Sequence, residues 1–483
     1  MKKTFRSVLC TALILPIALT GCAFHDSGNG YGENRNAMDG SSENSLENGG
    51  ISDGGFSGLN GLAIRTAVYP EMAPYPDWMS YINSNGEMDD SFNEAYDAWW
   101  EDIKVQRNQP EGYAEGLEGF FNDSIRQFLS GSQGQNRVYS PLNVCMALGM
   151  LAEVTDGRSR EQILTLLGSD DMNALRSQAR AIWNANYRND GVSTTILASS
   201  LWLNENVNFT QSTLDSLADN YYASSYQGTM GSPELDRALQ AWLNEQTGGL
   251  LKDQTSQVNL NPETIMALAA TISFHAKWHN EFSESRTEKG VFHGANGDIN
   301  CDFMHQGGSR TYYWGEQFSA VAQGFENGGG MWFILPDEGV SVDELLQDKQ
   351  VMKFILTNEW EDSKYLIVNL SVPKFDVASD MDLVSGLKAL GVTDIFDSEV
   401  SDFSPMTADT EEIYLSQAMH AARVMIDEEG CTAVAYTVMP AAGAAMPPDE
   451  EIDFILDRPF LFVITGSDNL PLFVGVVNQP IDF

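Results

Sequence analysis

The segment that decides the fold reads DEEGCTAVAYT, from Asp427 to Thr437. Acidic residues and one glycine open it, and small residues then hold every second position: Cys431, Ala433, Ala435 and Thr437. The positions between them hold the branched or aromatic residues Thr432, Val434 and Tyr436. Because alternation with period two is typical of a β-strand, the segment is predicted to turn its small side chains toward a crowded interior.

The same run continues into a stretch with the composition of an exposed loop. Residues 438–448 read VMPAAGAAMPP, in which only alanine, glycine, proline, valine and methionine occur. Glycine and proline at this density favour a flexible surface loop. We therefore predict a loop whose first half is able to become a strand.

Composition limits the classes of function. The chain has 483 residues, 43% of them hydrophobic and 10% aromatic, which is enough for a large core. The formal net charge is −41, from 68 acidic and 27 basic residues. Because nucleic acids and anionic membranes attract basic surfaces, this charge argues against both as binding partners. It favours solubility outside the cell.

The amino terminus has the pattern of an export signal. Lys2, Lys3 and Arg6 precede an apolar run, 8–19, that is too short to remain as a membrane-spanning helix. The run ends in LTGC, which resembles a bacterial lipobox with Cys22 as the lipidated residue. We expect residues 1–21 to be a lipoprotein signal peptide and the protein to be lipid-anchored at the bacterial cell surface, facing outward. The alternative is an ordinary secretory signal with an incidental cysteine.

Three further regions follow. Residues 22–60 are rich in Gly, Asn and Ser and predict a disordered tether. Residues 61–112 contain an aromatic cluster with helical spacing at 92–100, and we expect this extension to pack on the main domain, residues 113–483. Cys145, Cys301 and Cys431 form an odd, widely spaced set that favours buried thiols over a disulfide framework.

Motifs in the main domain occur in a recognisable order. Ser140 before Pro141 predicts the start of a helix, and the apolar residues 142–151 predict that the helix is buried. Further motifs are NRVYSPL at 136–142, TISFHAKW at 271–278, PKF at 373–375, DRPFLF at 457–462 and LFVGV at 472–476. Together with the opening segment they resemble the serpin family. The resemblance implies an α+β fold with three β-sheets, about eight to nine helices and an exposed reactive loop.

The resemblance also implies the site residues. The hinge of the reactive loop would consist of Glu428, Glu429, Gly430, Cys431, Thr432, Ala433, Val434, Ala435, Tyr436 and Thr437. The family's fixed interval places the reactive bond between Ala444 and Ala445, with Ala445–Met446 as the second choice. The region where the central sheet opens would contain Ser140, Asn143, His420, Trp278 and Lys374, with Lys374 paired to Glu428.

Two residues depart from the family pattern in this region. Asn143 stands where the family usually has a serine, and Ala270 stands where it has an asparagine. The polar cluster under the opening sheet is therefore expected to be incomplete.

The implied mechanism is suicide inhibition of a serine protease. The protease cuts the loop, and the freed hinge segment inserts into the central sheet, which small inward residues allow. Small residues around Ala444 suit an elastase-like or subtilisin-like target, whereas Pro440 is expected to slow late insertion. The alternative is a non-inhibitory serpin that serves as a surface binding or structural lipoprotein.

Enzymatic activity is not expected. The sequence has no Gly-x-Ser-x-Gly motif and only six histidines. His275 and His279 have i,i+4 spacing, which leaves a metal site open, although core histidines are favoured. We expect no cofactor and a monomer.

Overall fold

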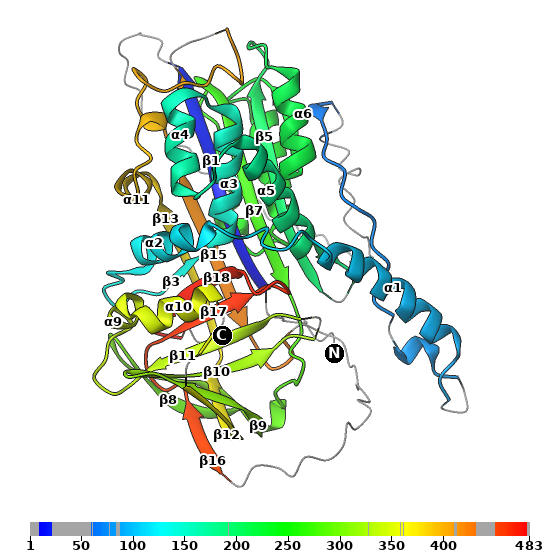
Figure 1. Cartoon of the computed structure of the whole chain (residues 1–483), viewed down its shortest axis with the longest axis vertical. Helices are drawn as coiled ribbons and strands as arrows, with labels where there is room; N and C mark the ends of the chain where they lie inside the picture. The colour runs from blue at the N-terminus through cyan, green and yellow to red at the C-terminus, as the bar shows by residue number, and fades with distance from the viewer. Residues whose placement is uncertain are drawn as a thin grey trace, which may run out of the picture.

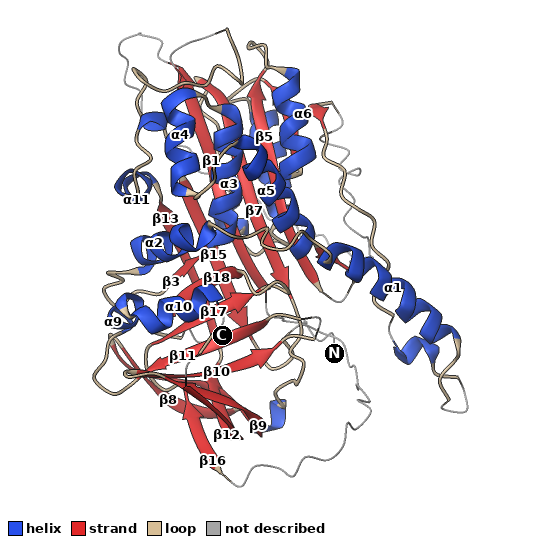
Figure 2. Cartoon of the chain, viewed as in Figure 1, coloured by secondary structure: helices blue, strands red, loops and turns tan. Residues whose placement is uncertain are grey.

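The computed structural model describes residues 9–21, 59, 61–76, 78–83, 87–191, 193–326, 328–357, 359–360, 362–409, 413–430 and 450–480. These residues form eleven α-helices, three 3₁₀ helices and eighteen β-strands. Helices α3 to α6 lie against one face of a tall sheet, and a second group of strands forms the lower part of the molecule (Figures 1 and 2).

The tall sheet has nine strands, and the described part of the hinge follows one of them, β15. Its path runs through β13 (Phe375–Asp382), β15 (Met419–Ile426), β1 (Leu9–Gly21), β7 (Thr264–His275), β5 (Thr194–Asn204), β6 (Ala223–Gly228) and β2 (Ala63–Arg65), with β14 (Ile413–Leu415) beside β1 and β4 (Arg188–Asn189) beside β5. Strands β5 and β7 are buried over nearly their whole length. Their near-continuous apolar sequences fit this position, because both faces of a central strand are covered.

The remaining strands form two sheets that share one long strand. They are β16 (Glu451–Ile455), β12 (Asp362–Pro373), β9 (Gly297–Trp314), β10 (Phe318–Gly324), β11 (Gly330–Pro336), β17 (Phe460–Thr465), β18 (Pro471–Val477) and β3 (Arg137–Tyr139), with β8 (Glu288–Gly294) beside β9. Strand β9 pairs with β8 and β12 and, at its end, with β10. The expected three sheets are present, and hydrogen bonding runs continuously through two of them.

The helices of the main domain are α2 (Leu117–Leu129), α3 (Pro141–Val154), α4 (Gly157–Leu166), α5 (Met172–Asn186), α6 (Gln211–Tyr221), α7 (Pro233–Gln246), α8 (Lys252–Thr255), α9 (Val342–Gln347), α10 (Lys349–Thr357) and α11 (Val384–Ala389). Short 3₁₀ helices span Trp78–Tyr81, Glu284–Arg286 and Asp394–Phe396. These ten α-helices slightly exceed the eight to nine expected, and α8 is a single turn of four residues.

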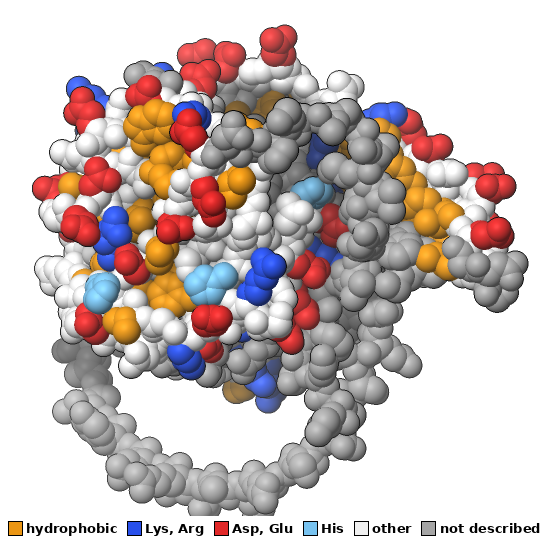
Figure 3. Space-filling view, turned by 90° about the horizontal axis from the view of Figure 1, so that it is seen from below, with side chains coloured by type: hydrophobic (Ala, Val, Ile, Leu, Met, Phe, Trp, Pro, Cys, Tyr) orange, Lys and Arg blue, Asp and Glu red, His pale blue; other side chains and the backbone are white. Residues whose placement is uncertain are grey.

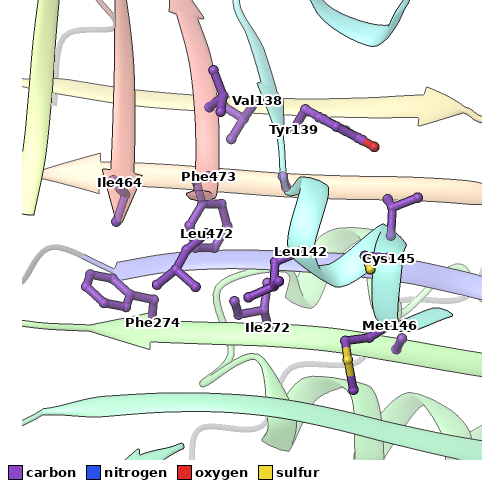
Figure 4. Close-up of a cluster of buried hydrophobic side chains, with 14 of the residues drawn as sticks. Val138, Tyr139, Leu142, Cys145, Met146, Ile272, Phe274, Ile464, Leu472 and Phe473 are labelled. Carbon is purple, nitrogen blue, oxygen red and sulfur yellow. The ribbon is translucent and has the colours of Figure 1, made fainter. Parts of the chain in front are cut away.

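Helix α3 is the buried centre of the main domain, as its sequence predicts. Every one of its fourteen residues is buried. The side chain of Ser140 accepts a hydrogen bond from the backbone N–H of Asn143, and Pro141 occupies the first turn, so the predicted helix start is confirmed. In Figure 4, Leu142, Cys145 and Met146 of this helix lie among side chains from β3, β7, β17 and β18.

The amino-terminal extension contacts the main domain at several points. Strand β2 pairs with β6 and so adds an edge strand to the tall sheet. The Arg65 guanidinium bonds to Asp215 at 3.0 Å and to Asp219 at 2.8 Å. Helix α1 (Ser91–Arg107) projects from the body, and apolar side chains are visible along this projection in Figure 3. Its buried Trp99 donates from Nε1 to Asp190 at 3.1 Å.

The predicted export signal has an unexpected position. Residues Leu9–Gly21 form β1, in the middle of the tall sheet. No helix in the described part of the chain is long and apolar enough to cross a membrane. The tether, apart from Leu59, lies outside the described residues, as do Cys22, Ala444, Ala445 and the hinge positions from Cys431 to Thr437. Cys145 is buried, as expected, and so is Cys301.

Candidate functional site: the hinge and the sheet-opening region

The described part of the hinge is a tight turn after β15. It runs from Asp427 to Gly430, and Gly430 has a φ angle of +71°. A Cβ atom at Gly430 would lie 2.3 Å from the backbone nitrogen of Trp278. Both the backbone angle and this close approach require glycine, because any larger residue would strain the turn or displace the chain beside it.

Glu428 anchors this turn to two other segments. Its carboxylate accepts from Lys374 Nζ at 2.6 Å and from Thr287 Oγ1 at 2.6 Å, and its backbone carbonyl accepts from Phe282 N at 2.9 Å. The predicted ion pair is therefore present, and the Glu428 side chain is only 8% exposed. Burial by itself would raise the pKa of Glu428, but the bonds from Lys374 and Thr287 outweigh it and hold the pKa below its ordinary value. A buried, doubly bonded carboxylate contributes more than an exposed surface pair.

Asp427, one residue earlier, has the opposite electrostatic environment. Its backbone carbonyl accepts from Trp278 Nε1 at 2.9 Å, and its side chain accepts from Glu429 N at 3.1 Å. Burial raises the pKa of Asp427 to about 7, and the negative charges of Glu428 and Glu429 act in the same direction. The carboxyl group therefore changes charge near neutral pH while it is held against the hinge.

Further acidic residues surround the same turn. Burial raises the pKa of Glu281 and of Glu326, against the opposing charge of Lys277. Lys277 is only 2% exposed, and its backbone carbonyl accepts from Glu326 N at 3.0 Å. The end of the sheet beside this turn thus gathers acidic side chains around the buried Lys277.

A second polar cluster lies deeper, between α3 and β15. The backbone N–H of Ser140 donates to His420 Nε2 at 3.1 Å, and Ser140 Oγ donates to the carbonyl of Leu472 at 2.6 Å. The ring of Tyr139 meets the His420 ring edge-on, with centroids 5.4 Å apart. Burial lowers the pKa of His420 to about 3, so its imidazole is neutral and can accept from Ser140. These bonds connect helix α3 with β15 and β18.

Asn143 connects this cluster to the next strand. Its backbone N–H donates to Ser140 Oγ at 3.4 Å, and its Nδ2 donates to the carbonyl of Ala270 on β7 at 3.4 Å. The two departures from the family pattern therefore meet in space. The longer side chain of Asn143 reaches the strand on which Ala270 lacks a polar group, and the sequence alone did not reveal this link.

Trp278 lies three residues beyond the end of β7, between the hinge and the neighbouring sheet. It stacks on Phe325, with ring centroids 5.1 Å apart and an interplanar angle of 12°, and it is 2% exposed. Its backbone forms an isolated bridge with Phe325. Trp278 thus joins the sheet end to the hinge carbonyl at Asp427.

The histidines provide no metal centre in the described part of the chain. No group of three or more His, Cys, Asp or Glu residues there could hold a metal ion. Burial and the nearby charge of Lys277 lower the pKa of His275 to about 4, which is typical of a core histidine. His293 and His305 instead bond to Asp298 and Ser371, at 2.8 Å in each case.

Comparison with known proteins places this arrangement in a family. Residues 116–480 match the family model for "Serpin (serine protease inhibitor)". The chain belongs to the serpin family. Serpin-ZX of Arabidopsis thaliana is 27% identical over 367 residues, which cover 72% of this chain and 93% of that protein. Alpha-1-antiproteinase of Rattus norvegicus is 26% identical, over 80% of this chain and 94% of that protein.

Solved serpin structures have the same fold. The thermophilic serpin tengpin in its native state matches with a TM-score of 0.67 at 25% identity, covering 77% of this chain and 95% of tengpin. Arabidopsis AtSerpin1, described as a native stressed conformation, matches with a TM-score of 0.65. Serpins are protease inhibitors rather than enzymes, and the relatives of this serpin include proteins named as inhibitors.

Proposed function

We propose that this serpin is an extracellular suicide inhibitor of serine endopeptidases that cleave after small residues. It would be held at the bacterial cell surface through lipid on Cys22, as a monomer. The observation that carries the proposal is the geometry at the end of β15, where an anchored glutamate and a packed glycine precede a segment with small alternate residues.

The hinge geometry supports controlled release of the loop. Glu428 fixes the turn through Lys374 and Thr287, and Gly430 allows the chain to reverse within four residues of β15. Cys431, Ala433 and Ala435 are small enough to enter a packed sheet without overpacking it. The segment after the turn can therefore run back along β15 as an antiparallel strand.

The sheet has one strand position between β7 and β15, which β1 fills in this structure. Strands β7 and β15 do not pair with each other in the described structure, and both present backbone groups to a single strand between them. Each ladder hydrogen bond contributes about 0.5–1.5 kcal/mol net. A strand of about fifteen residues would gain on the order of 10 kcal/mol, which supplies the free energy for displacing and distorting an attached protease.

The gap between β14 and β15 also weakens the objection that Pro440 would hinder insertion. Strand β14 ends at Leu415 and β15 begins at Met419, so residues 416–418 belong to neither strand. A four-residue turn at 427–430 places Cys431 opposite Ile426, and counting nine residues along each strand takes Pro440 to Gln417. A proline at this level would remove little pairing, because the neighbouring strand is already interrupted there.

The proposed specificity rests on residues near the reactive bond. Ala444 and Ala445 lie among small side chains, and no basic residue occurs between Arg423 and Arg458. Proteases with shallow primary pockets, such as elastase-like or subtilisin-like enzymes, would accept them. Trypsin-like enzymes, which need a basic side chain, would not.

The test uses the exported protein isolated from membranes of the expressing bacterium, with its amino terminus determined by mass spectrometry. It is mixed with elastase or subtilisin, and the products are boiled in detergent and separated by electrophoresis. We expect a covalent complex, and a higher melting temperature for the loop-cleaved protein. Ala433→Glu is the matched control, because a buried charge blocks insertion while leaving the reactive bond available.

Two results would contradict the proposal. Cleavage with neither complex formation nor a rise in melting temperature would leave a non-inhibitory serpin with a binding or structural role. Complex formation by Ala433→Glu at the rate of the unaltered protein would show that inhibition does not use insertion in this register.

A further inference from the structure

The predicted export signal occupies a specific place in the sheet. Strand β1 runs antiparallel to both of its neighbours (Figure 1). It pairs with β7 from Leu9, opposite His275, to Thr20, opposite Thr264. It pairs with β15 from Leu9, opposite Met425, to Leu15, opposite Met419, and then with β14. Both neighbours are thus engaged over almost the full height of the sheet.

This place is the position that the reactive loop would need. The hinge follows β15 directly, and Leu9 lies opposite Met425, two residues before Asp427. A loop that turned back at Gly430 would meet this part of the sheet first. Because neighbouring strands lie about 4.8 Å apart, the space between β7 and β15 holds one strand and not two.

The sequence of the segment suits the position. The residues of β7 and β15 level with its centre are buried, including Ala270, Ile272, His420 and Ala422, each 0% exposed. A strand covered on both faces needs a continuous apolar run, which residues 8–19 provide. Pro16 falls where pairing with β15 has ended and the register with β7 shifts, so the residue that cannot donate lies at the irregular point.

We propose that the uncleaved amino-terminal segment is an autoinhibitory strand that holds the sheet closed to the reactive loop. This inference rests on the proposed inhibitory function. Removal of residues 1–21 during export would vacate the position, so the chain would become an inhibitor only after processing. If the segment occupies the sheet in about 99% of unprocessed molecules, complex formation falls about 100-fold relative to the processed protein.

The experiment compares full-length chains that differ only in this strand. Cys22→Ser retains the segment by removing the predicted processing residue, and the full chain is purified with its amino terminus verified by mass spectrometry. A second chain adds Leu13→Asp and Ile14→Asp. Because both faces of a central strand are covered, a charge at either position would disfavour keeping the segment in the sheet. The matched control adds Leu46→Asp and Ile51→Asp in the 22–60 segment instead.

Two readouts are measured on each chain. One is the rate of detergent-stable complex formation with elastase or subtilisin. The other is amide hydrogen exchange of residues 9–15, which reports the strand whether or not the protein inhibits. In the chain that retains the segment and in the control, we expect the amides of residues 9–15 to exchange slowly. Both chains should form the protease complex at least tenfold more slowly than the processed protein. In the chain with Leu13→Asp and Ile14→Asp, these amides should exchange fast, and complex formation should reach the rate of the processed protein.

The outcomes separate the two proposals. If the chain that retains the segment forms complex as fast as the processed protein, the autoinhibitory strand is overturned and the inhibitory function is left intact. Fast exchange of residues 9–15 in the retained chain would overturn it as well. If the processed protein forms no complex, the proposed function fails. Slow amide exchange of residues 9–15 would then support only the place of this strand in the sheet.

Discussion

Replacing Asp427 with asparagine should change how stability depends on pH. The carboxyl group lies in the hinge turn, where burial and the charges of Glu428 and Glu429 raise its pKa from 3.8 to about 7. A carboxyl group whose pKa is higher in the folded than in the unfolded state stabilises the folded protein when protonated. That contribution is complete below about pH 4 and is lost as the pH rises through 7.

The size of the effect follows from the change in pKa. Each pKa unit corresponds to about 1.4 kcal/mol, so a rise from 3.8 to about 7 sets a ceiling of about 4 kcal/mol. Because the side chain is partly open to solvent, we expect about 2 kcal/mol. Glu428 acts with the opposite sign, because its pKa is lower in the folded than in the unfolded state. Its contribution to stability is present above the pKa of the unfolded state and is lost only in more acidic solution. Comparison with a variant of Asp427 therefore isolates its contribution, because the raised pKa values of Glu281 and Glu326 are common to both proteins.

The assay is urea unfolding of Asp427→Asn and of the unaltered protein at pH 4.5, 6 and 8. Asparagine keeps the shape of the side chain and cannot ionise. The variant should exceed the unaltered protein by about 1 kcal/mol at pH 4.5, where the carboxyl group of the unfolded chain is already mostly ionised, and by about 2 kcal/mol at pH 8. Asp170→Asn, at an exposed position, is the control and should show no such trend. A difference that stays constant across the three pH values would refute the electrostatic argument.

Four further predictions concern the hinge, the loop and the extension. Lys374→Met should cost about 1–3 kcal/mol, because it leaves the carboxylate of Glu428 buried without its cation; adding Glu428→Gln should recover part of this loss in urea unfolding. Gly430→Ala should lower the melting temperature and slow complex formation, since an alanine Cβ meets backbone at 2.3 Å. Ala444→Arg should redirect complex formation from elastase to trypsin-like enzymes, and unchanged preference would place the reactive bond elsewhere. Arg65→Met should expose the extension to limited proteolysis by removing its bonds to helix α6, whereas unchanged cleavage would show that these bonds do not hold it.

Local sequence patterns predicted much of the framework. The Ser140–Pro141 pair marked a helix start because capping depends on only a few adjacent residues. The run of apolar residues at 142–151 marked a buried helix, and every residue of α3 is indeed buried. The ion pair of Lys374 with Glu428 followed from the family resemblance and is present.

The structure revealed what depends on distant partners. The link from Asn143 to Ala270 joins residues 127 positions apart, and neither residue alone indicates it. The raised pKa of Asp427 also depends on burial by other segments, which composition does not report.

The sequence by itself determined that residues 8–19 form an apolar run, and it predicted that the segment after Gly430 can become a strand, because both patterns belong to consecutive side chains. Only the tertiary structure decided where such strands fit. A membrane leader and a central strand both require an apolar surface on every side, so the same residues satisfy either environment. The choice is made by β7 and β15, which do not pair with each other and offer their backbone groups to whichever strand lies between them.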